Sequence, residues 1–185
     1  MLLNACYIFS EKVIIMNGLI IIGYQGIGKT TLTKNNEEMY YGNGFPVIDF
    51  ESSLFKIDGD RVDDWYVIYC RQAVAMAKQG FVVFVSSHQC VRNELGKYDQ
   101  DDVGIATIAP TYALKDQWID KLHKRYLNNP SEKNLAAFKD AEENYDKNIY
   151  QISSNPLFTH IFINSMGYSL KTILKGLFLI FDLTF

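Results

Sequence analysis

Residues 23–30 read Gly23-Tyr24-Gln25-Gly26-Ile27-Gly28-Lys29-Thr30 and have the pattern Gly-x4-Gly-Lys-Thr. The unbroken apolar run Leu19-Ile20-Ile21-Ile22 precedes this segment and predicts a buried strand that ends at Gly23. The glycines let the backbone turn so that consecutive N–H groups point at an anion, and the helix expected near Lys29 adds its positive N-terminal end. A strand, a glycine-rich turn and a helix in this order predict a phosphate-binding loop, or P-loop.

The predicted loop assigns roles to individual side chains. Lys29 would reach the β- and γ-phosphates of a nucleotide, and the Thr30 hydroxyl would ligate Mg²⁺. ATP and Mg²⁺ are therefore the cofactors that we expect. The residues expected to contact the nucleotide phosphates are Gly23, Gln25, Gly26, Ile27, Gly28, Lys29, Thr30 and Thr31.

Short apolar strands alternate with helices along the rest of the chain. Further strands are expected at 45–49, 81–85, 103–108 and 159–164, and helices or helical turns at 30–36, 61–79, 89–96, 112–127, 131–150 and 167–176. This alternation is typical of an α/β fold, here a three-layer sandwich with a five-stranded parallel sheet and a small helical lid. Because such sheets bind ligands at the carboxyl ends of their strands, functional residues should follow Ile22, Ile48, Val85 and Ile108.

Length and composition suit one globular domain. The chain has 185 residues, of which 48% are hydrophobic and 21% are charged. We expect residues 1–15 to be an N-terminal extension and residues 16–185 to form the domain, with the lid at about 121–155. The net charge of −3 gives no strong signal for nucleic-acid binding.

The cysteines and the apolar segments bear on the compartment and on partners. Cys6, Cys70 and Cys90 are far apart and odd in number, which favours free thiols and a cytoplasmic protein. No apolar run approaches the length that spans a membrane. The apolar stretch 177–185 is expected to dock on the domain or to join copies of the chain in a homo-oligomer.

The predicted strand ends carry chemistry of their own. Asp49 ends the second strand, where its carboxylate would face Mg²⁺ or orient an acceptor hydroxyl and take its proton, with a strand-end turn residue as the alternative. Glu51 is a weaker candidate for the same role. The third strand ends in Ser86-Ser87, where a motor ATPase usually carries an acidic pair, and no Asn-Lys-x-Asp segment is present to select guanine. The sequence thus points away from motors and GTPases.

The order of these features resembles the nucleotide- and small-molecule kinases of the P-loop class, such as adenylate, shikimate, gluconate and adenylylsulfate kinases. Residues 85–95 resemble the segment of gluconate-kinase-like proteins in which Ser and Arg meet the acceptor, and this resemblance assigns Ser87 and Arg92 to acceptor binding. Arg71, on the helix expected after Asp49, would bind an acceptor phosphate or carboxylate as a bidentate fork, with an exposed helix charge as the alternative.

Residues 114–125 resemble the helix that runs into the lid of these kinases, where basic residues close on the transferring phosphoryl group. Lys121, Lys124 and Arg125 share one helical face, either as lid cations or as an ordinary solvated face. The resemblance implies that the catalytic residues are Lys29, Asp49 and Arg125.

Two functions follow from the sequence and stay open at this point. The first is ATP-dependent phosphoryl transfer to a small acceptor, such as a nucleoside monophosphate or another hydroxyl or phosphate compound. The alternative is an ATP-binding or ATP-hydrolysing switch that acts on a macromolecular partner through the apolar C-terminus. Trp65, Tyr66 and Tyr69 would either stack on an acceptor ring or form a core stripe, because Trp65 and Tyr69 are four residues apart.

Overall fold

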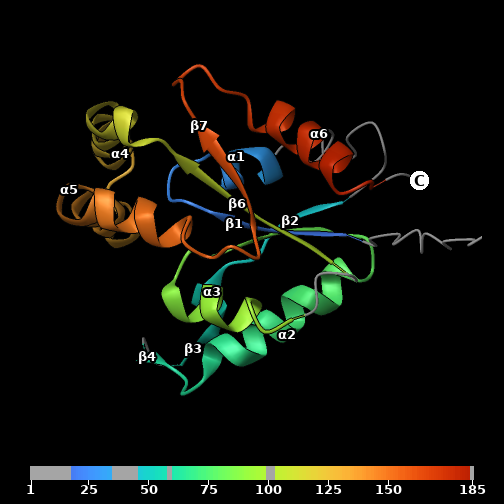
Figure 1. Ribbon diagram of the computed structural model, residues 1–185. Helices are drawn as coiled ribbons and strands as arrows, with labels where there is room; N and C mark the ends of the chain where they lie inside the picture. The colour runs from blue at the N-terminus through green and yellow to red at the C-terminus, as the bar shows by residue number, and fades with distance from the viewer. Residues whose placement is uncertain (1–17, 35–45, 58–59, 99–102, 184–185) are drawn as a thin grey trace, which may run out of the picture.

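A parallel sheet of five strands runs through the centre of the protein (Figure 1). The computed structural model describes residues 18–34, 46–57, 60–98 and 103–183. The predicted N-terminal extension and Phe45 lie outside this part. The strands are β1 (Leu19–Gly23), β2 (Val47–Asp49), β5 (Val82–Val85), β6 (Gly104–Pro110) and β7 (Thr159–Ile163), in the order β2-β5-β1-β6-β7. The predicted α/β fold with a five-stranded parallel sheet is confirmed.

β1 is the innermost strand, and all five of its residues are buried. Ile21 lies opposite Phe84 of β5 and Ala106 of β6, so apolar side chains surround β1 on both sides. A continuous apolar run is what a strand covered on both faces requires. From β1 the chain continues to one side of the sheet, towards β2, whereas from β6 it continues to the other side, towards β7. Parallel sheets bind ligands at such a switch point, and the segment 23–30 begins there.

Helices cover both faces of the sheet (Figure 1). One face carries α1 (Lys29–Lys34) and α6 (Leu170–Ile180), and the other carries α2 (Trp65–Ala77) and α3 (Gln89–Leu95). The helix expected at 112–127 is divided into the short 3-10 helix η3 (Tyr112–Leu114) and α4 (Lys115–Asn128). α4 and α5 (Glu132–Ile152) form a hairpin beyond the carboxyl ends of the strands.

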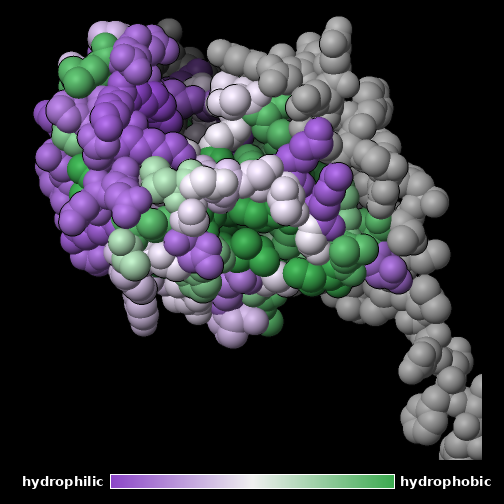
Figure 2. All heavy atoms as spheres, turned by 90° about the horizontal axis from the view of Figure 1, so that it is seen from above, coloured by the Kyte–Doolittle hydropathy of each residue, from purple (hydrophilic) through white to green (hydrophobic). Residues whose placement is uncertain are grey.

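The α4–α5 hairpin is hydrophilic outside and apolar where it meets the domain. Hydrophilic side chains gather over it at the left of Figure 2. Ser131 caps α5, as expected, by accepting a hydrogen bond from the Asn134 N–H. The buried apolar side chains of α5 are Ala141, Tyr145, Ile149 and Ile152. The region predicted as a lid therefore packs on the rest of the domain through a continuous apolar stripe.

The chain between β2 and α2 differs from the prediction of a helix that begins at Arg61. The 3-10 helix η2 (Ser52–Phe55) comes first, and β3 (Lys56–Ile57) then pairs antiparallel with β4 (Asp60–Arg61). α2 begins only at Trp65, because Asp64 has a φ of 53° and cannot continue a right-handed helix. Trp65 and Tyr69 are buried among other core side chains, which supports the core-stripe alternative over stacking on a ligand.

The last helix, expected to begin at about Gly167, begins at Leu170 as α6 and ends at Ile180. Phe181 packs against Gly104, where an added Cβ would lie 2.7 Å from the Phe181 ring. Leu177, Phe178 and Leu183 are also buried, whereas Leu179 and Ile180 are 83% and 58% exposed. Most of the described C-terminal stretch thus belongs to the core, and its role between copies of the chain stays a prediction. Among the described helices, none combines the length and apolarity needed to cross a membrane.

Candidate functional site

The loop after β1 has two glycines that a side chain would disturb. Gly26 and Gly28 have φ values of 83° and 98°, which L-residues with a side chain rarely adopt. At Gly26 an added Cβ would also lie 2.9 Å from Leu122 and 3.3 Å from the Trp118 Nε1 atom. At Gly28 the same atom would meet nothing within 4 Å. The loop is therefore packed tightly on the side of α4 and open at Gly28.

Several backbone N–H groups of this loop have no hydrogen-bond acceptor within the described chain. They belong to Gly26, Gly28, Lys29 and Thr30. The last two are first-turn N–H groups of α1, which no helix can satisfy internally. Backbone turns that combine left-handed and right-handed conformations, followed by a helix N-terminus, form a concave anion site. The loop thus has several N–H groups without an acceptor among the described residues.

Two aromatic side chains hold the loop by its carbonyl groups. The Trp118 Nε1–H donates to the Gln25 carbonyl at 2.9 Å, and the Tyr168 hydroxyl donates to the Ile27 carbonyl at 2.9 Å. Their rings stack with centroids 5.8 Å apart. In a trans peptide the C=O and the following N–H point in opposite directions. Fixing these two carbonyls therefore turns the N–H groups of Gly26 and Gly28 away from the aromatic pair.

Lys29, Thr30 and Asp49 come together at the start of α1. The Lys29 ammonium donates to the Gly23 carbonyl at 2.9 Å, and the Thr30 hydroxyl donates to Asp49 Oδ2 at 2.8 Å. Burial lowers the pKa of Lys29, and the nearby carboxylates of Asp49 and Glu51 oppose this shift. Hydroxyl and carboxylate oxygens are the ligands that Mg²⁺ prefers, so the Thr30–Asp49 pair fits that ion.

Two further cations act on Lys29. The charges of Lys133 and Arg125 both lower the pKa of Lys29, although less than burial does. Lys133 forms an ion pair with Glu51 at 2.6 Å and thereby joins the start of α5 to the segment after β2. Burial lowers the pKa of Arg125, and its Nε atom is buried without an acceptor among the described residues. Arg125, predicted as catalytic, therefore has a buried Nε–H group without an acceptor among the described residues, and its charge acts on Lys29.

Lys121 and Lys124, the other two predicted lid cations, lie in different surroundings from Arg125. Lys121 rests over the rings of Trp118 and Tyr168, at 4.2 and 4.9 Å from their centroids, and donates to the Tyr168 hydroxyl at 3.0 Å. Lys124 forms an exposed ion pair with Asp120 at 2.6 Å. The three residues share a helical face, but only Arg125 acts on Lys29.

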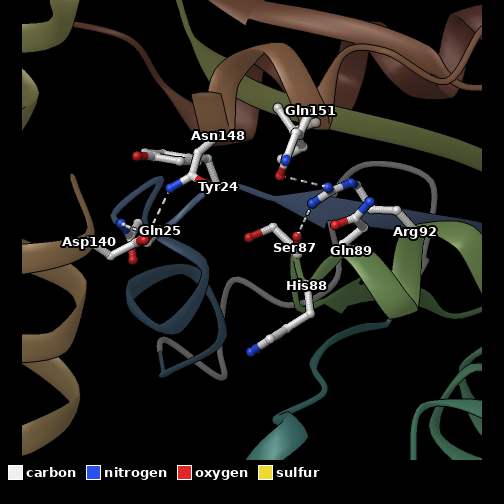
Figure 3. Close-up of a pocket in the computed structure, with 10 residues that line it drawn as sticks. Tyr24, Gln25, Ser87, His88, Gln89, Arg92, Asp140, Asn148 and Gln151 are labelled. Atoms are coloured by element: carbon white, nitrogen blue, oxygen red, sulfur yellow. Dashed lines mark hydrogen bonds between the residues drawn. The ribbon is translucent and has the colours of Figure 1, made fainter. Parts of the chain in front are cut away.

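A cavity of about 290 Å³ opens beside the loop (Figure 3). The segment after β1 forms one wall, the segment after β5 with the start of α3 forms the second, and α5 forms the third. Its lining residues are Tyr24, Gln25, Ser87, His88, Gln89, Arg92, Asp140, Asn148, Gln151 and Ile152. Ser87 and Arg92, expected to bind the acceptor, are both among them. Arg71 is not, because it is exposed on α2 and its charge acts on Tyr98.

A charged side chain lies at each end of the cavity, and the one at the first end, Arg92, is buried. Arg92 is only 8% exposed and donates to the Ser87 carbonyl and, at 3.4 Å, to Gln151 Oε1. Burial lowers the pKa of Arg92. At the other end, Asp140 accepts hydrogen bonds from the side-chain amides of Gln25, Asn144 and Asn148 at 3.1, 3.2 and 2.8 Å. Figure 3 shows the two groups facing one another across the cavity.

Sequence reasoning missed the contribution of α5 to this cavity. Asp140, Asn144, Asn148 and Gln151 recur at spacings of four, four and three residues, which puts them on one helical face. This run of uncharged amides and one carboxylate at helical spacing was a usable signal. The aromatic pair Trp118 and Tyr168 had no comparable signal, because its members meet only in the folded chain.

Comparison with protein-family models finds no match, and comparison with curated proteins finds no relative. Within the described residues there is no group of three or more His, Cys, Asp or Glu side chains that could hold a metal ion. Any bound Mg²⁺ would therefore take most of its ligands from nucleotide phosphates and water, as is usual for this ion. The functional conclusion rests on the geometry of the loop and of the cavity.

Proposed function

We propose that the protein is a P-loop phosphotransferase that binds Mg·ATP at residues 23–30 and transfers the γ-phosphoryl group to a small acceptor in the adjacent cavity. The unpaired N–H groups of Gly26, Gly28, Lys29 and Thr30 carry this proposal. Such a cluster is costly unless an anion or water satisfies it. The ammonium of Lys29 adds a cationic donor to this loop, and the charge of Arg125 acts on the same lysine.

Each residue of the loop then has a defined task. The backbone N–H groups and Lys29 hold the phosphates, and Lys29 exchanges its bond to the Gly23 carbonyl for a bond to phosphate oxygen. Thr30 and Asp49 would hold Mg²⁺, which neutralises phosphate charge when it is bound. Arg125 stabilises the charge that develops on the transferred group.

In this proposal the acceptor binds in the cavity. An acceptor oxygen forms a bond to the γ-phosphorus, the bond between that phosphorus and the bridging oxygen breaks, and ADP leaves. The acceptor proton is lost to the Asp49 carboxylate or to water. A switch that acts on a macromolecular partner is the less favoured function, because a polar cavity of small-molecule size beside the loop is what a second substrate requires.

The Lys29→Ala variant tests the proposal. Removal of the ammonium should weaken ATP binding about tenfold to hundredfold and abolish acceptor-stimulated ADP release, because a charge-assisted hydrogen bond is lost. Calorimetric titration with Mg·ATP and a coupled assay for ADP measure the two effects. Lys175→Ala, at an exposed position of α6, is the matched control. Unchanged ATP affinity in a folded Lys29→Ala protein would contradict the site assignment.

A further inference from the structure

The side-chain amides of the cavity are oriented by the charges beside them. A carboxylate only accepts hydrogen bonds, so Gln25 and Asn148 must turn their NH₂ groups towards Asp140. A guanidinium only donates, so Gln151 must turn its carbonyl oxygen towards Arg92. Gln25 and Asn148 thus keep free carbonyl oxygens, whereas Gln151 keeps a free NH₂ group. The walls of the cavity therefore present acceptors at one end and a donor at the other.

A buried hydroxyl group adds to the first end. Tyr24 is 2% exposed and lines the cavity, and the side-chain amides of Gln25 and Asn148 lie within hydrogen-bonding reach of its buried hydroxyl. The amides of Gln25 and Asn148 and the carboxylate of Asp140 lie near enough to act on its pKa, which burial raises to about 12. The hydroxyl is therefore neutral at physiological pH. The neutral hydroxyl is therefore part of the polar network that Gln25, Asn148 and Asp140 form at this end of the cavity.

The charge of the cavity disfavours a phosphate on the acceptor. Apart from His88, the lining residues include one cation, Arg92, and one anion, Asp140. Arg92 already donates hydrogen bonds to the Ser87 carbonyl and to Gln151. A buried phosphate dianion needs several unpaired cationic donors and is repelled by a carboxylate in the same small space. A neutral molecule avoids both penalties.

We infer that the acceptor is an uncharged, hydroxyl-bearing ring compound about as large as a nucleoside or a monosaccharide, and that Gln25, Asn148 and Gln151 recognise its hydrogen-bonding edge. This inference rests on the proposed function and narrows its substrate class. The cavity of about 290 Å³ lies at the small end of ligand sites, which suits one ring system better than a second nucleotide. The phosphoryl group moves from ATP to a ring or sugar hydroxyl, and the products are ADP and a monophosphate.

An acceptor panel tests the inference. Adenosine, guanosine, cytidine, thymidine, ribose and glucose are compared with AMP, GMP, CMP and TMP, each with Mg·ATP, and the phosphorylated acceptor is detected by mass spectrometry. We expect at least one neutral compound to be phosphorylated with a kcat/KM about tenfold or more above that of any monophosphate. A monophosphate that is converted to a diphosphate faster than every neutral compound overturns the inference and leaves the proposed function standing.

Variants of α5 test which groups recognise the acceptor. Asn148→Leu should raise the KM for the neutral acceptor about tenfold, because a hydrogen-bonding edge is left unpaired, with the KM for ATP unchanged. Asn144→Ala is the matched control, since Asn144 also donates to Asp140 but does not line the cavity. Equal effects of the two substitutions would overturn the recognition role.

A measurement of acceptor binding without turnover tests the inference independently of the proposed function. Calorimetric titration with the six neutral compounds requires no turnover, so it remains informative if Lys29→Ala shows that ATP does not use the loop. Binding of a neutral compound that Asn148→Leu weakens supports the inference. No binding of any neutral compound, by a protein that still binds Mg·ATP, overturns it.

Discussion

At the scale of single residues, two carbonyl groups of the loop accept hydrogen bonds from side chains, whereas several of its N–H groups have no acceptor among the described residues. Trp118 and Tyr168 contact the carbonyls of Gln25 and Ile27 and thereby set the directions of the next N–H groups. Neither aromatic side chain needs to contact a ligand for this effect. They are positioning residues for the proposed phosphate site.

Loss of the hydrogen bond from either aromatic residue to the loop should weaken nucleotide binding. We expect Tyr168→Phe and Trp118→Phe each to reduce the affinity for Mg·ATP about threefold to tenfold, since one hydrogen bond contributes about 0.5–1.5 kcal/mol. The affinity for the acceptor should not change, which separates a positioning role from general damage. Tyr150→Phe, at an exposed position, is the control for calorimetric titration. Wild-type affinity for Mg·ATP in both variants would show that the loop holds its shape without them.

The Thr30–Asp49 hydrogen bond leads to a prediction about metal dependence. Asp49→Asn keeps an acceptor oxygen for the Thr30 hydroxyl but removes the negative charge. We expect kcat to fall about a hundredfold and the Mg²⁺ concentration for half-maximal rate to rise, while ATP affinity changes little. The measurement is the rate of phosphoryl transfer against Mg²⁺ concentration. Glu51→Gln, which breaks the ion pair with Lys133, is the comparison, and a matching loss in both variants would argue against a special role for Asp49.

At the scale of elements, α5 both packs on the domain and lines the cavity, whereas α6 packs on the domain and does not line the cavity. α5 buries one apolar stripe and turns a polar stripe to the cavity, so its sequence serves both the core and the site. α6 is buried through Leu170, Leu174, Leu177 and Phe178, and the turn after it places Phe181 against β6. The stability of the sheet therefore depends on the end of the described chain.

A pair of substitutions near the end of α6 tests this dependence. Phe181→Ala should lower the free energy of unfolding by about 3 kcal/mol, because the aromatic ring fills the space over Gly104. Leu179→Ala, two residues away but 83% exposed, should change it by less than about 0.5 kcal/mol. Urea denaturation of both variants gives the comparison. If the two values agreed, the C-terminal stretch would be a surface segment rather than part of the core.

At the scale of the whole molecule, the buried cation of α4 makes stability depend on pH. Burial, and secondarily the charge of Arg125, lowers the pKa of Lys121 from 10.5 to about 8. The unfolded chain therefore binds more protons than the folded chain between these two pH values. The contribution of Lys121 to the free energy of unfolding is least favourable below pH 8 and becomes more favourable as the pH rises towards 10.5.

The Lys121→Met variant should remove this pH dependence. Its free energy of unfolding, relative to wild type, should be highest at about pH 7 and should fall as the pH rises to about 9.5, because only the wild type gains stability there. Tyr168, which faces Lys121, stays neutral in this range because burial raises its pKa to about 12. Urea denaturation at three pH values measures the difference, with the exposed Lys124→Met as control. Parallel pH curves for wild type and Lys121→Met would contradict the assignment.

Features that depend on interactions between residues close in sequence could be predicted, whereas those that depend on distant residues could not. The strands, most helices and the glycine turn were predictable, because apolar periodicity, glycine φ angles and the Ser131 cap act over a few residues. The predicted start of α2 at Arg61 was wrong, because nothing in the local sequence pattern indicated the positive φ of Asp64. Arg71 was assigned to the acceptor on its residue type alone, and the fold places it outside the cavity.

Local sequence was enough to specify a central apolar strand that opens into a turn with unpaired N–H groups and a helix carrying Lys29 and Thr30. The remaining contacts of the loop depend on long-range packing. Trp118, Tyr168 and Asp140 are separated from their partners in the loop by 93, 141 and 115 positions in the sequence. The hydrogen-bonding capacity of a side chain is written in its residue type, whereas its partner depends on how helices and strands pack. The cavity, which three separate segments of the chain line, therefore forms only when the chain folds.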